Sequence, residues 1–421
     1  MITSSYARRR WVLTLGLLAA SHGASPALAA DPVPRLAEMT CTALDQAVQA
    51  QAAGPLLLAS YPPVAGQQPE IQALRGVAFT YDNALASIAL FACGKAQSAR
   101  RIADALAYAT LHDPDYQDGR LRNAYAAGPL KNGPMTLPGY WSTQRNAWNQ
   151  DAYQISSATG NQAWGALALL EAFRQTHEEP YLKAAQRVLR WTEQKTYDSR
   201  PPEGFIGGYY GYPPEQARQD WKSTEHNADL AAAWTALDQL HADEHAARQA
   251  KIARQFVFSQ WDAREGRFLI GTLGDGRTSD RSRSGLDAQI WPLIALQDPP
   301  ADWHRVFSFI DQAHRSGAGY GFKRNPDGLW TEGTAQTAAV ARLSGAPEKA
   351  QPLWAVLAAQ QAGDGWLFAT PQARISTGLA IGPDSVIDDF YYYHLPHLGA
   401  TAWAAIAATG INPFTGSREA N

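Results

Sequence analysis

The 421-residue sequence has few sulfur-containing residues and no excess of positive charge. It contains 2 cysteines and 3 methionines, and its 39 acidic residues outnumber its 36 lysines and arginines. Proteins that bind nucleic acids present a basic surface, so this balance argues against a nucleic acid as the partner. After residue 30, no segment has the ~20 consecutive apolar residues that a membrane-spanning helix needs. We therefore expect neither nucleic-acid binding nor a membrane span.

Several motifs of well-known enzyme classes are also missing. The sequence has no P-loop, no G-x-G-x-x-G before a predicted helix and no G-x-S-x-G elbow, so nucleotide and serine-hydrolase chemistries lack support. His226 lies near Glu225 and Asp229, but no second histidine stands at metal-ligand spacing. We expect no metal and no cofactor.

The first 29 residues have the features of an export signal. Three arginines at positions 8–10 precede an apolar run over 11–20, and an A-x-A cleavage pattern follows at 27–29. The arginines also fit a twin-arginine signal loosely, so either export route is open. Both routes predict a single domain, 30–421, that is periplasmic or secreted. Without these three of the 36 basic residues, 33 remain against 39 acidic ones, a net charge of −6.

The two cysteines, Cys41 and Cys93, have two possible states. An even number of cysteines in an oxidising compartment permits one disulfide. Two free, buried thiols fit the sequence equally well. Both states stay open at this point.

Apolar residues at helical spacing predict twelve helices and only short strands. The helices are of two kinds that alternate. One kind, such as 243–260, has an apolar stripe backed by lysine and arginine, as in a helix with one exposed face. The other kind, such as 226–241, is apolar almost all round and should be buried. The predicted segments are 36–53, 83–93, 96–110, 161–177, 180–196, 226–241, 243–260, 286–297, 302–316, 334–345, 348–362 and 398–410.

This alternation predicts an all-α fold, an (α/α)6 toroid in which the last helix pairs with the first. Six buried inner helices would be ringed by six outer ones, and long links would lead from each outer helix to the next inner helix at one mouth. Gly-rich and Asp-Gly signals predict small β-hairpins within three of these links. The predicted hairpins are Gly204–Tyr212, Gly266–Ser279 and Gly319–Trp330.

Four of the six inner helices are predicted to begin with an acid: Asp82, Glu225, Asp287 and Glu332. A single acid in a first turn is explained by the positive end of the helix dipole. Four acids that converge on one mouth, mixed with aromatic and amide side chains, indicate a polar pocket. Functional residues concentrate in such long links and at such mouths.

The helix alternation, together with "KSTEHNADL" and "WTEGTAQ" at two inner-helix starts, resembles the six-hairpin glycosidase superfamily of (α/α)6 toroids. The resemblance covers the predicted mature chain as an architecture and assigns no single family. It implies a polysaccharide or oligosaccharide in the cleft, cut by a pair of carboxylates. It leaves open which pair, because families of this superfamily place their acids on different hairpins.

Glycoside hydrolysis needs one protonated and one ionised carboxyl group. We expect Glu225 to be the ionised base or nucleophile, because the helix dipole and Lys222 favour its charged form. Glu332 beside the apolar Trp330 would keep its proton and act as the acid. Asp82 and Asp287 would bind sugar hydroxyls or replace one of the two.

Other polar and aromatic residues at the predicted mouth are candidates for substrate binding. His394 and His397 around Leu395-Pro396 fit two roles equally, hydrogen bonds to sugar hydroxyls or capping of the final inner helix. The candidate binding residues are Trp221, Lys222, His226, Tyr209, Tyr210, Gln289, Trp330, Gln336, Tyr392 and His394.

Two other functions use the same fold. A polysaccharide lyase or sugar epimerase would move a proton with tyrosine and histidine, and a lyase would also need cations such as Lys222, Lys323 and Arg324 for an acidic sugar. A non-catalytic exopolysaccharide-binding protein would keep the aromatic cleft without an acid pair. We expect a hydrolase that acts as a monomer on a glycan.

Overall fold

The computed structural model describes residues 32–64 and 69–418. The predicted export signal therefore lies outside the described residues. From Pro32 onward the chain forms one compact unit. No helix among the described residues has both the length and the apolar character to cross a membrane.

All twelve predicted helical segments are present, and the predicted all-α toroid is confirmed. The segment predicted over 286–297 is divided after Trp291, because Pro292 has no N–H to continue the hydrogen-bond ladder. The helices are α1 (Pro32–Gln49), α2 (Thr80–Ala92), α3 (Ala96–Ala109), α4 (Thr159–Thr176), α5 (Glu179–Thr196), α6 (Thr224–His241), α7 (Glu244–Ser259), α8 (Leu286–Ile290), α9 (Pro292–Ala295), α10 (Val306–Ala313), α11 (Thr331–Leu343), α12 (Pro347–Ala358) and α13 (Leu398–Thr409).

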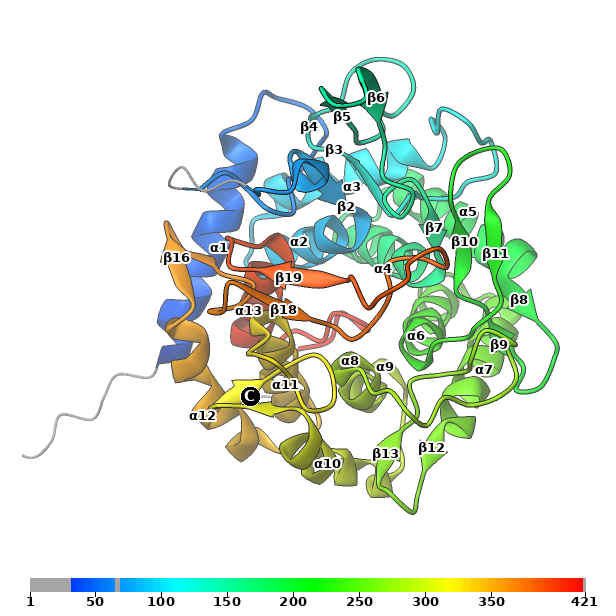
Figure 1. Ribbon diagram of the computed structural model, residues 1–421, viewed down its shortest axis with the longest axis vertical. Helices are drawn as coiled ribbons and strands as arrows, with labels where there is room; N and C mark the ends of the chain where they lie inside the picture. Colours follow the sequence, from blue (N-terminus) through cyan, green and yellow to red (C-terminus); the bar gives the residue numbers. More distant parts are fainter. Residues whose placement is uncertain (1–31, 65–68, 419–421) are drawn as a thin grey trace, which may run out of the picture. The chain divides into compact units, whose positions relative to one another are not determined.

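The inner helices α2, α4, α6, α8 with α9, α11 and α13 form a closed ring, and the outer helices α1, α3, α5, α7, α10 and α12 lie around it (Figure 1). Each inner helix packs against the next, and α13 packs against both α2 and α1. The predicted pairing of the last helix with the first is therefore confirmed.

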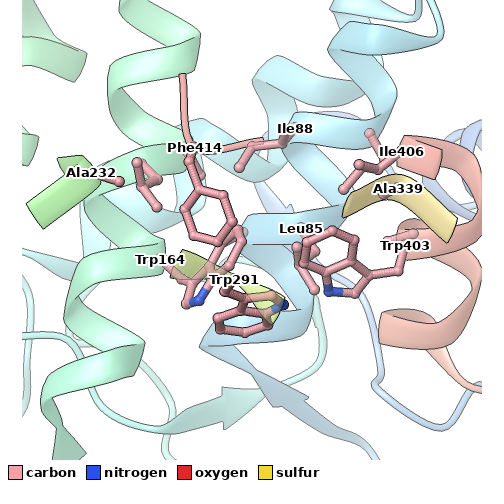
Figure 2. Close-up of a cluster of buried hydrophobic side chains, with 14 of the residues drawn as sticks. Leu85, Ile88, Trp164, Ala232, Trp291, Ala339, Trp403, Ile406 and Phe414 are labelled. Atoms are coloured by element: carbon pink, nitrogen blue, oxygen red, sulfur yellow. The ribbon is translucent and has the colours of Figure 1, made fainter. Parts of the chain in front are cut away.

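The interior of the ring is filled by aromatic side chains (Figure 2). Trp164, Trp291 and Trp403 come from three sides of the ring, and their ring centroids lie 5.3 to 5.9 Å apart. Phe414, from the segment after α13, packs against Trp164 and Trp291. The ring therefore has a closed floor, and a ligand can approach its axis only from the mouth.

A repeated hydrogen bond ties each inner helix to the link that precedes it. The fourth residue of every inner helix uses its side chain to pair with the backbone of one residue in that link. Four of these residues are amides that bond both the N–H and the C=O, and the other two are threonines. The pairs are Asn83 with Leu58, Gln162 with Leu121, Asn227 with Phe205, Gln289 with Phe268, Thr334 with Tyr320 and Thr401 with Leu367.

A second repeat joins each inner helix to the link that follows its hairpin. The backbone N–H of the first helical residue donates to a carbonyl of that link, and the last helix returns to the first link. The six bonds run from Thr80 to Asn123, Thr159 to Gly207, Thr224 to Ile270, Leu286 to Phe322, Thr331 to Ala369 and Leu398 to Ser60. Together they close a circle around the mouth.

Short antiparallel strand pairs form in the links. Four of these pairs directly follow an outer helix: β8 (Tyr197–Asp198) with β9 (Gly204–Phe205), β12 (Trp261–Asp262) with β13 (Arg267–Phe268), β14 (Arg315–Ser316) with β15 (Gly319–Tyr320), and β16 (Gln361–Gly363) with β17 (Trp366–Leu367). The others are β1 (Leu56–Leu57) with β4 (Gly128–Pro129), β2 (Val77–Phe79) with β3 (Ala124–Ala126), β5 (Tyr140–Ser142) with β6 (Ala147–Asn149), β18 (Arg374–Ser376) with β19 (Tyr391–Tyr393), and β10 (Gly208–Tyr210) between β7 (Ser157–Ala158) and β11 (Ala217–Gln219).

Two of the three predicted hairpins are therefore wrong. In the run 204–212, β9 pairs back with β8 while β10 pairs with β11 and β7. In the run 319–330, Gly319–Tyr320 pairs with the residues just before it, and Lys323 forms an isolated bridge with Gly285. Pro326 lacks the N–H that a strand ladder would need beyond that point. The turn at Asp275-Gly276 is confirmed by a bridge between Thr272 and Ser279.

The two cysteines form a disulfide, which settles the alternatives that the sequence left open. Cys41 of α1 bonds Cys93 at the end of α2, with a Cα–Cα distance of 5.7 Å. The bond joins an outer helix to the neighbouring inner one.

Candidate functional site

The second residue of each inner helix lies at the mouth, and the sixth lies one turn deeper on the same face, because residues four apart share a helix face. The second residues are Tyr81, Gly160, Glu225, Asp287, Glu332 and Gly399. The sixth residues are Leu85, Trp164, Asp229, Trp291, Gln336 and Trp403. With Asp82 beside Tyr81, five carboxyl groups gather there: Asp82, Glu225, Asp229, Asp287 and Glu332.

Glu332 is held by hydrogen bonds from two neighbouring side chains. Its side chain is fully buried, and its Oε1 accepts hydrogen bonds from the Tyr81 hydroxyl at 2.7 Å and from Gln336 Nε2 at 3.2 Å. The Tyr81 hydroxyl in turn accepts from Trp403 Nε1 at 2.8 Å, which ties Glu332 to the aromatic floor. Glu332 Oε2 is buried without a hydrogen-bond partner.

Asp82 and Glu332 lie on either side of α13. A β-carbon at Gly399 would lie 2.7 Å from Asp82 Oδ1 and 2.9 Å from Glu332 Oε2. The distance between these two oxygens therefore cannot exceed the sum of the two values. That sum is below ~6.5 Å, the shortest separation between the two catalytic carboxyl groups of inverting glycosidases. The backbone of Gly399 lies beside both oxygens and leaves no room for a sugar between them.

The imidazole of His397 is neutral between the same two acids. Its Nδ1 accepts the backbone N–H of Ala400 at 3.1 Å, so a neutral ring carries its proton on Nε2. Nε2 lies 3.7 Å from Asp82 Oδ2, and Nδ1 lies 3.7 Å from Glu332 Oε2. Burial lowers the pKa of His397 to about 3. It therefore caps α13 and gives the acids no positive charge.

Glu225, Asp229 and Asp287 form the other side of the group. Glu225 is partly exposed, whereas Asp229 and Asp287 are buried. Burial and the neighbouring Asp287 raise the pKa of Glu225 well above its usual range. Burial and Asp287 do the same to Asp229, whose two oxygens have no hydrogen-bond partner. Both shifts favour the protonated form of these two carboxyl groups.

Asp287 ionises most readily of the five. Burial raises its pKa only to about 6, because backbone N–H groups oppose the shift, among them that of Ala288 at 2.6 Å from Oδ1. Burial raises the pKa of Asp82 to about 7, and burial with the neighbouring Asp82 raises that of Glu332 well above its usual range. The site therefore favours ionisation of Asp287 over that of its four neighbours.

The helix dipole does not explain these acids. The outer helices α5, α7 and α12 also begin with acids, Glu179, Glu244 and Glu348, but all three are exposed. On the inner helices burial raises the pKa values, which is opposite to the effect of the dipole. The pKa shift of Glu225 is therefore opposite in direction to the expected stabilisation of its ionised form.

Lys222 does not reach the acids. Its ammonium group is buried and bonds Asp198 Oδ2 at 3.0 Å and the carbonyl oxygens of Arg200 and Pro202 at 2.8 and 2.7 Å. The predicted support of Glu225 by Lys222 fails because the lysine is committed to the turn after β8. In the described part of the chain, no lysine or arginine forms a salt bridge with the five acids.

Gln289 and Gln336, both predicted to bind substrate, have structural partners. Gln289 is the repeated fourth-position amide of α8 and bonds the backbone of Phe268. Gln336 is buried and donates to Glu332. Its contribution to the site is to orient that carboxyl group.

Trp330 is also buried, in contact with Phe322 and Tyr392. A β-carbon at Gly333 would lie 2.1 Å from the Trp330 ring, so this glycine makes room for the indole rather than for a ligand. Trp330 forms an apolar wall, as expected, but presents no face to a ligand.

The remaining predicted binding residues lie around the mouth. Trp221 and His226 are partly exposed with ring centroids 5.4 Å apart, and burial lowers the pKa of His226 to about 4. Tyr392 is partly exposed near the acids. His394 stacks on Phe368 at 4.0 Å and its Nδ1 bonds the Thr370 carbonyl.

Tyr209 and Tyr210 lie on β10, further from the axis. Tyr209 packs against Trp191, and its hydroxyl donates to the carbonyl of Lys195 at 3.3 Å. The Tyr210 hydroxyl donates to Asp384 Oδ1 at 2.8 Å and so joins β10 to the β18–β19 loop. Neither tyrosine touches the five acids.

Sequence reasoning missed the roles of Tyr81 and Asp229. Tyr81 precedes Asp82 at the second position of α2, and Asp229 follows Glu225 by four residues. The spacing of four from Glu225, and the same spacing from Glu332 to Gln336, would have placed these pairs on one helix face.

No protein-family model matches the sequence, and neither does any curated protein. The fold is similar to solved structures. A glycosidase is 12% identical with a TM-score of 0.60 over 91% of this chain and 98% of that one. A cellobiose 2-epimerase from Bacillus thermoamylovorans B4167 is 9% identical with a TM-score of 0.59, over 89% and 99%. An alpha-amylase from Clostridium perfringens is 9% identical with a TM-score of 0.58, over 89% and 97%. These likenesses show the six-hairpin toroid fold.

Proposed function

We propose that the protein is a glycoside hydrolase that cleaves a polysaccharide or oligosaccharide at the mouth of the toroid. The observation that carries this proposal is a group of five carboxyl groups that form no salt bridge with a lysine or arginine of the described residues, in which burial raises every pKa and raises that of Asp287 least. Glycoside hydrolysis uses one protonated and one ionised carboxyl group on either side of the scissile bond. Solved glycosidases and an alpha-amylase with the same fold support the substrate class.

We assign the proton donor to Glu225 and the ionised partner to Asp287. Glu225 is the only one of the five that is partly exposed, so its proton can reach a glycosidic oxygen. Asp287 accepts backbone hydrogen bonds that favour its charged form. This assignment differs from the pair Glu225 and Glu332 that the sequence favours, because Glu332 is fully buried beneath Tyr81.

Epimerisation is the second candidate. A solved cellobiose 2-epimerase has the same fold, and His226 and His397 supply two neutral imidazoles from α6 and α13 at the mouth. A lyase is disfavoured, because it needs cations for an acidic sugar and the predicted cation Lys222 is bound to Asp198 instead. The product distinguishes the reactions, since hydrolysis creates a reducing end and epimerisation changes one sugar into another.

The test is a panel of neutral and acidic glycans incubated with the wild type, Glu225→Gln, Asp287→Asn and Glu332→Gln. Reducing ends, unsaturated products and sugar identity would be measured in parallel. We expect new reducing ends, lowered at least 100-fold in kcat by Glu225→Gln and by Asp287→Asn, as for removal of a general acid or base. Glu348→Gln, at the first turn of an outer helix, is the matched control and should be fully active.

Each other outcome has a distinct meaning. If Asp287→Asn hydrolyses glycans at the full rate and Glu332→Gln does not, the ionised partner of Glu225 is Glu332 rather than Asp287. Epimers without new reducing ends, lost in His226→Asn, would establish the second candidate. No change in any glycan would refute an enzyme and favour the glycan-binding alternative.

We also propose that the protein works in an oxidising compartment outside the cytoplasm. The disulfide between Cys41 and Cys93 supports this location, together with the export signal expected over 1–29. Fractionation of cells that express the full chain would test it. Protein found only in the cytoplasm with free thiols would refute the location.

A further inference from the structure

Two tryptophans stand exposed on a small hairpin at the edge of the ring. Trp141 of β5 is 51% exposed and Trp148 of β6 is 59% exposed. Every other tryptophan in the described part of the chain is buried or only partly exposed. Among the tryptophans of the described residues, this pair is therefore the most exposed.

The hairpin presents both indoles on one side. Trp141 and Trp148 are directly opposite each other in the antiparallel pair, and opposite residues project from the same face. A β-carbon at Gly139 would lie 2.5 Å from Trp148 Nε1, so the absence of a side chain there lets the Trp148 indole lie close to the backbone. The hairpin also carries polar residues, including Gln144, Asn146 and Asn149.

The hairpin leads to the acid group. Tyr212, which is 53% exposed, donates its hydroxyl to the carbonyl of Gln150, directly after β6. Tyr153 follows three residues later and packs against Phe79 and Phe390 at ring-centroid distances of 6.3 and 5.8 Å. Burial raises the pKa of Tyr153, and the nearby carboxyl group of Glu225 adds to this shift. Aromatic side chains therefore lie at the hairpin, next to its end at Tyr212, and close to the proposed proton donor at Tyr153 (Figure 1 shows β5 and β6 beyond β2 and β3).

We propose that Trp141 and Trp148, continued by Tyr212, form a distal binding site for a neutral sugar chain whose other end lies at the acid group. Sugar rings expose flat patches of C–H bonds that pack on indole faces, and amide side chains beside them can bond hydroxyl groups. A protein partner would call for a larger apolar patch than two indoles. This site deepens the proposed function, on which it rests, and predicts that the substrate is a chain rather than a disaccharide.

The first experiment measures kinetics on a ladder of chain lengths from whichever neutral glycan the wild type cleaves. The double variant Trp141→Ala/Trp148→Ala should raise KM for long chains about tenfold or more, as expected for two lost stacking contacts, with kcat and the shortest substrate unchanged. Trp141→Phe/Trp148→Phe should recover much of the loss. Leu111→Ala removes an exposed apolar residue elsewhere and should change nothing. An equal effect on short and long chains, or none, would overturn the proposal.

A second experiment separates this site from the chemistry. Electrophoresis through gels containing dextran, pullulan, barley β-glucan or galactomannan measures binding without turnover. Retardation of the wild type in one gel, lost in the double alanine variant, supports the site even if no hydrolysis is found. No retardation in any gel would overturn it. If the double variant differs from the wild type in sedimentation coefficient but not in glycan binding, the tryptophans instead join two copies of the chain.

Discussion

Asp82→Asn should change how the stability of the protein depends on pH. Asp82 is 3% exposed, and burial raises its pKa from 3.8 to about 7. Between these two values the unfolded chain loses the Asp82 proton while the folded protein keeps it. The free energy of unfolding therefore falls as pH rises through this window. Asparagine resembles the protonated carboxyl group and has no proton to lose, so the variant should lack this part of the fall.

The size of the effect follows from the width of the window. One pKa unit corresponds to 1.36 kcal/mol, so a shift of roughly three units gives about 4 kcal/mol. Removal of Asp82 also removes its contribution to the raised pKa of Glu332, which acts in the same direction, so this figure is the part that belongs to Asp82 alone. Relative to the wild type, Asp82→Asn should therefore gain about 4 kcal/mol between pH ~4 and pH ~8.

The assay is urea unfolding of both proteins at several pH values, followed by tryptophan fluorescence. Asp198→Asn is the control of opposite sign. Burial alone would raise the pKa of Asp198, but hydrogen bonds from Arg200 and Lys222 lower it to about 2. Its difference from the wild type should stay constant above pH ~4 and shrink only below it. Parallel curves for the wild type and Asp82→Asn would refute the claim that Asp82 is protonated in the folded protein.

The other predictions concern residues around the same mouth. Lys222→Met should lower the free energy of unfolding by about 3 kcal/mol, because Asp198 loses a buried partner. The kcat of the folded enzyme should stay within about twofold of the wild type. A large loss of kcat without a loss of stability would instead place Lys222 in the site. Gly399→Ala should cost about 1 to 3 kcal/mol in thermal unfolding, because its β-carbon would press on Asp82 and Glu332. Gly274→Ala, which has open space around it, should cost nothing measurable, and equal costs for the two glycines would contradict the crowding.

The helices could be predicted from sequence because their signals are local. An apolar stripe or an apolar surface all round needs only the residues of one helix, so both kinds and their alternation were visible. The strand pairs depend on longer separations. The Gly-rich run 204–212 carries turn signals, but whether β10 pairs with β9 or with β7 depends on where α4 begins, fifty residues earlier in the chain.

The site could be predicted in position but not in electrostatics. An acid at the second position of an inner helix is readable from the sequence, and so is its place at the mouth. The direction of its pKa shift depends on burial and on neighbours from other helices. Lys222 illustrates the difference, because its closeness in sequence to Glu225 indicated an ion pair, whereas Asp198 and two carbonyl groups bind it instead.

The circle of backbone hydrogen bonds explains why acids can occupy these helix starts. A helix N-terminus ordinarily needs a capping side chain for its unpaired N–H groups. Here the first N–H of each inner helix bonds the link of the next hairpin, and only Ser223 and His397 among the six preceding residues cap with a side chain. The second positions are therefore not needed for capping. They can hold buried carboxyl groups that lower stability at neutral pH. Side chains at these positions can also differ from one toroid to another, because the backbone hydrogen bonds that close the circle do not depend on them.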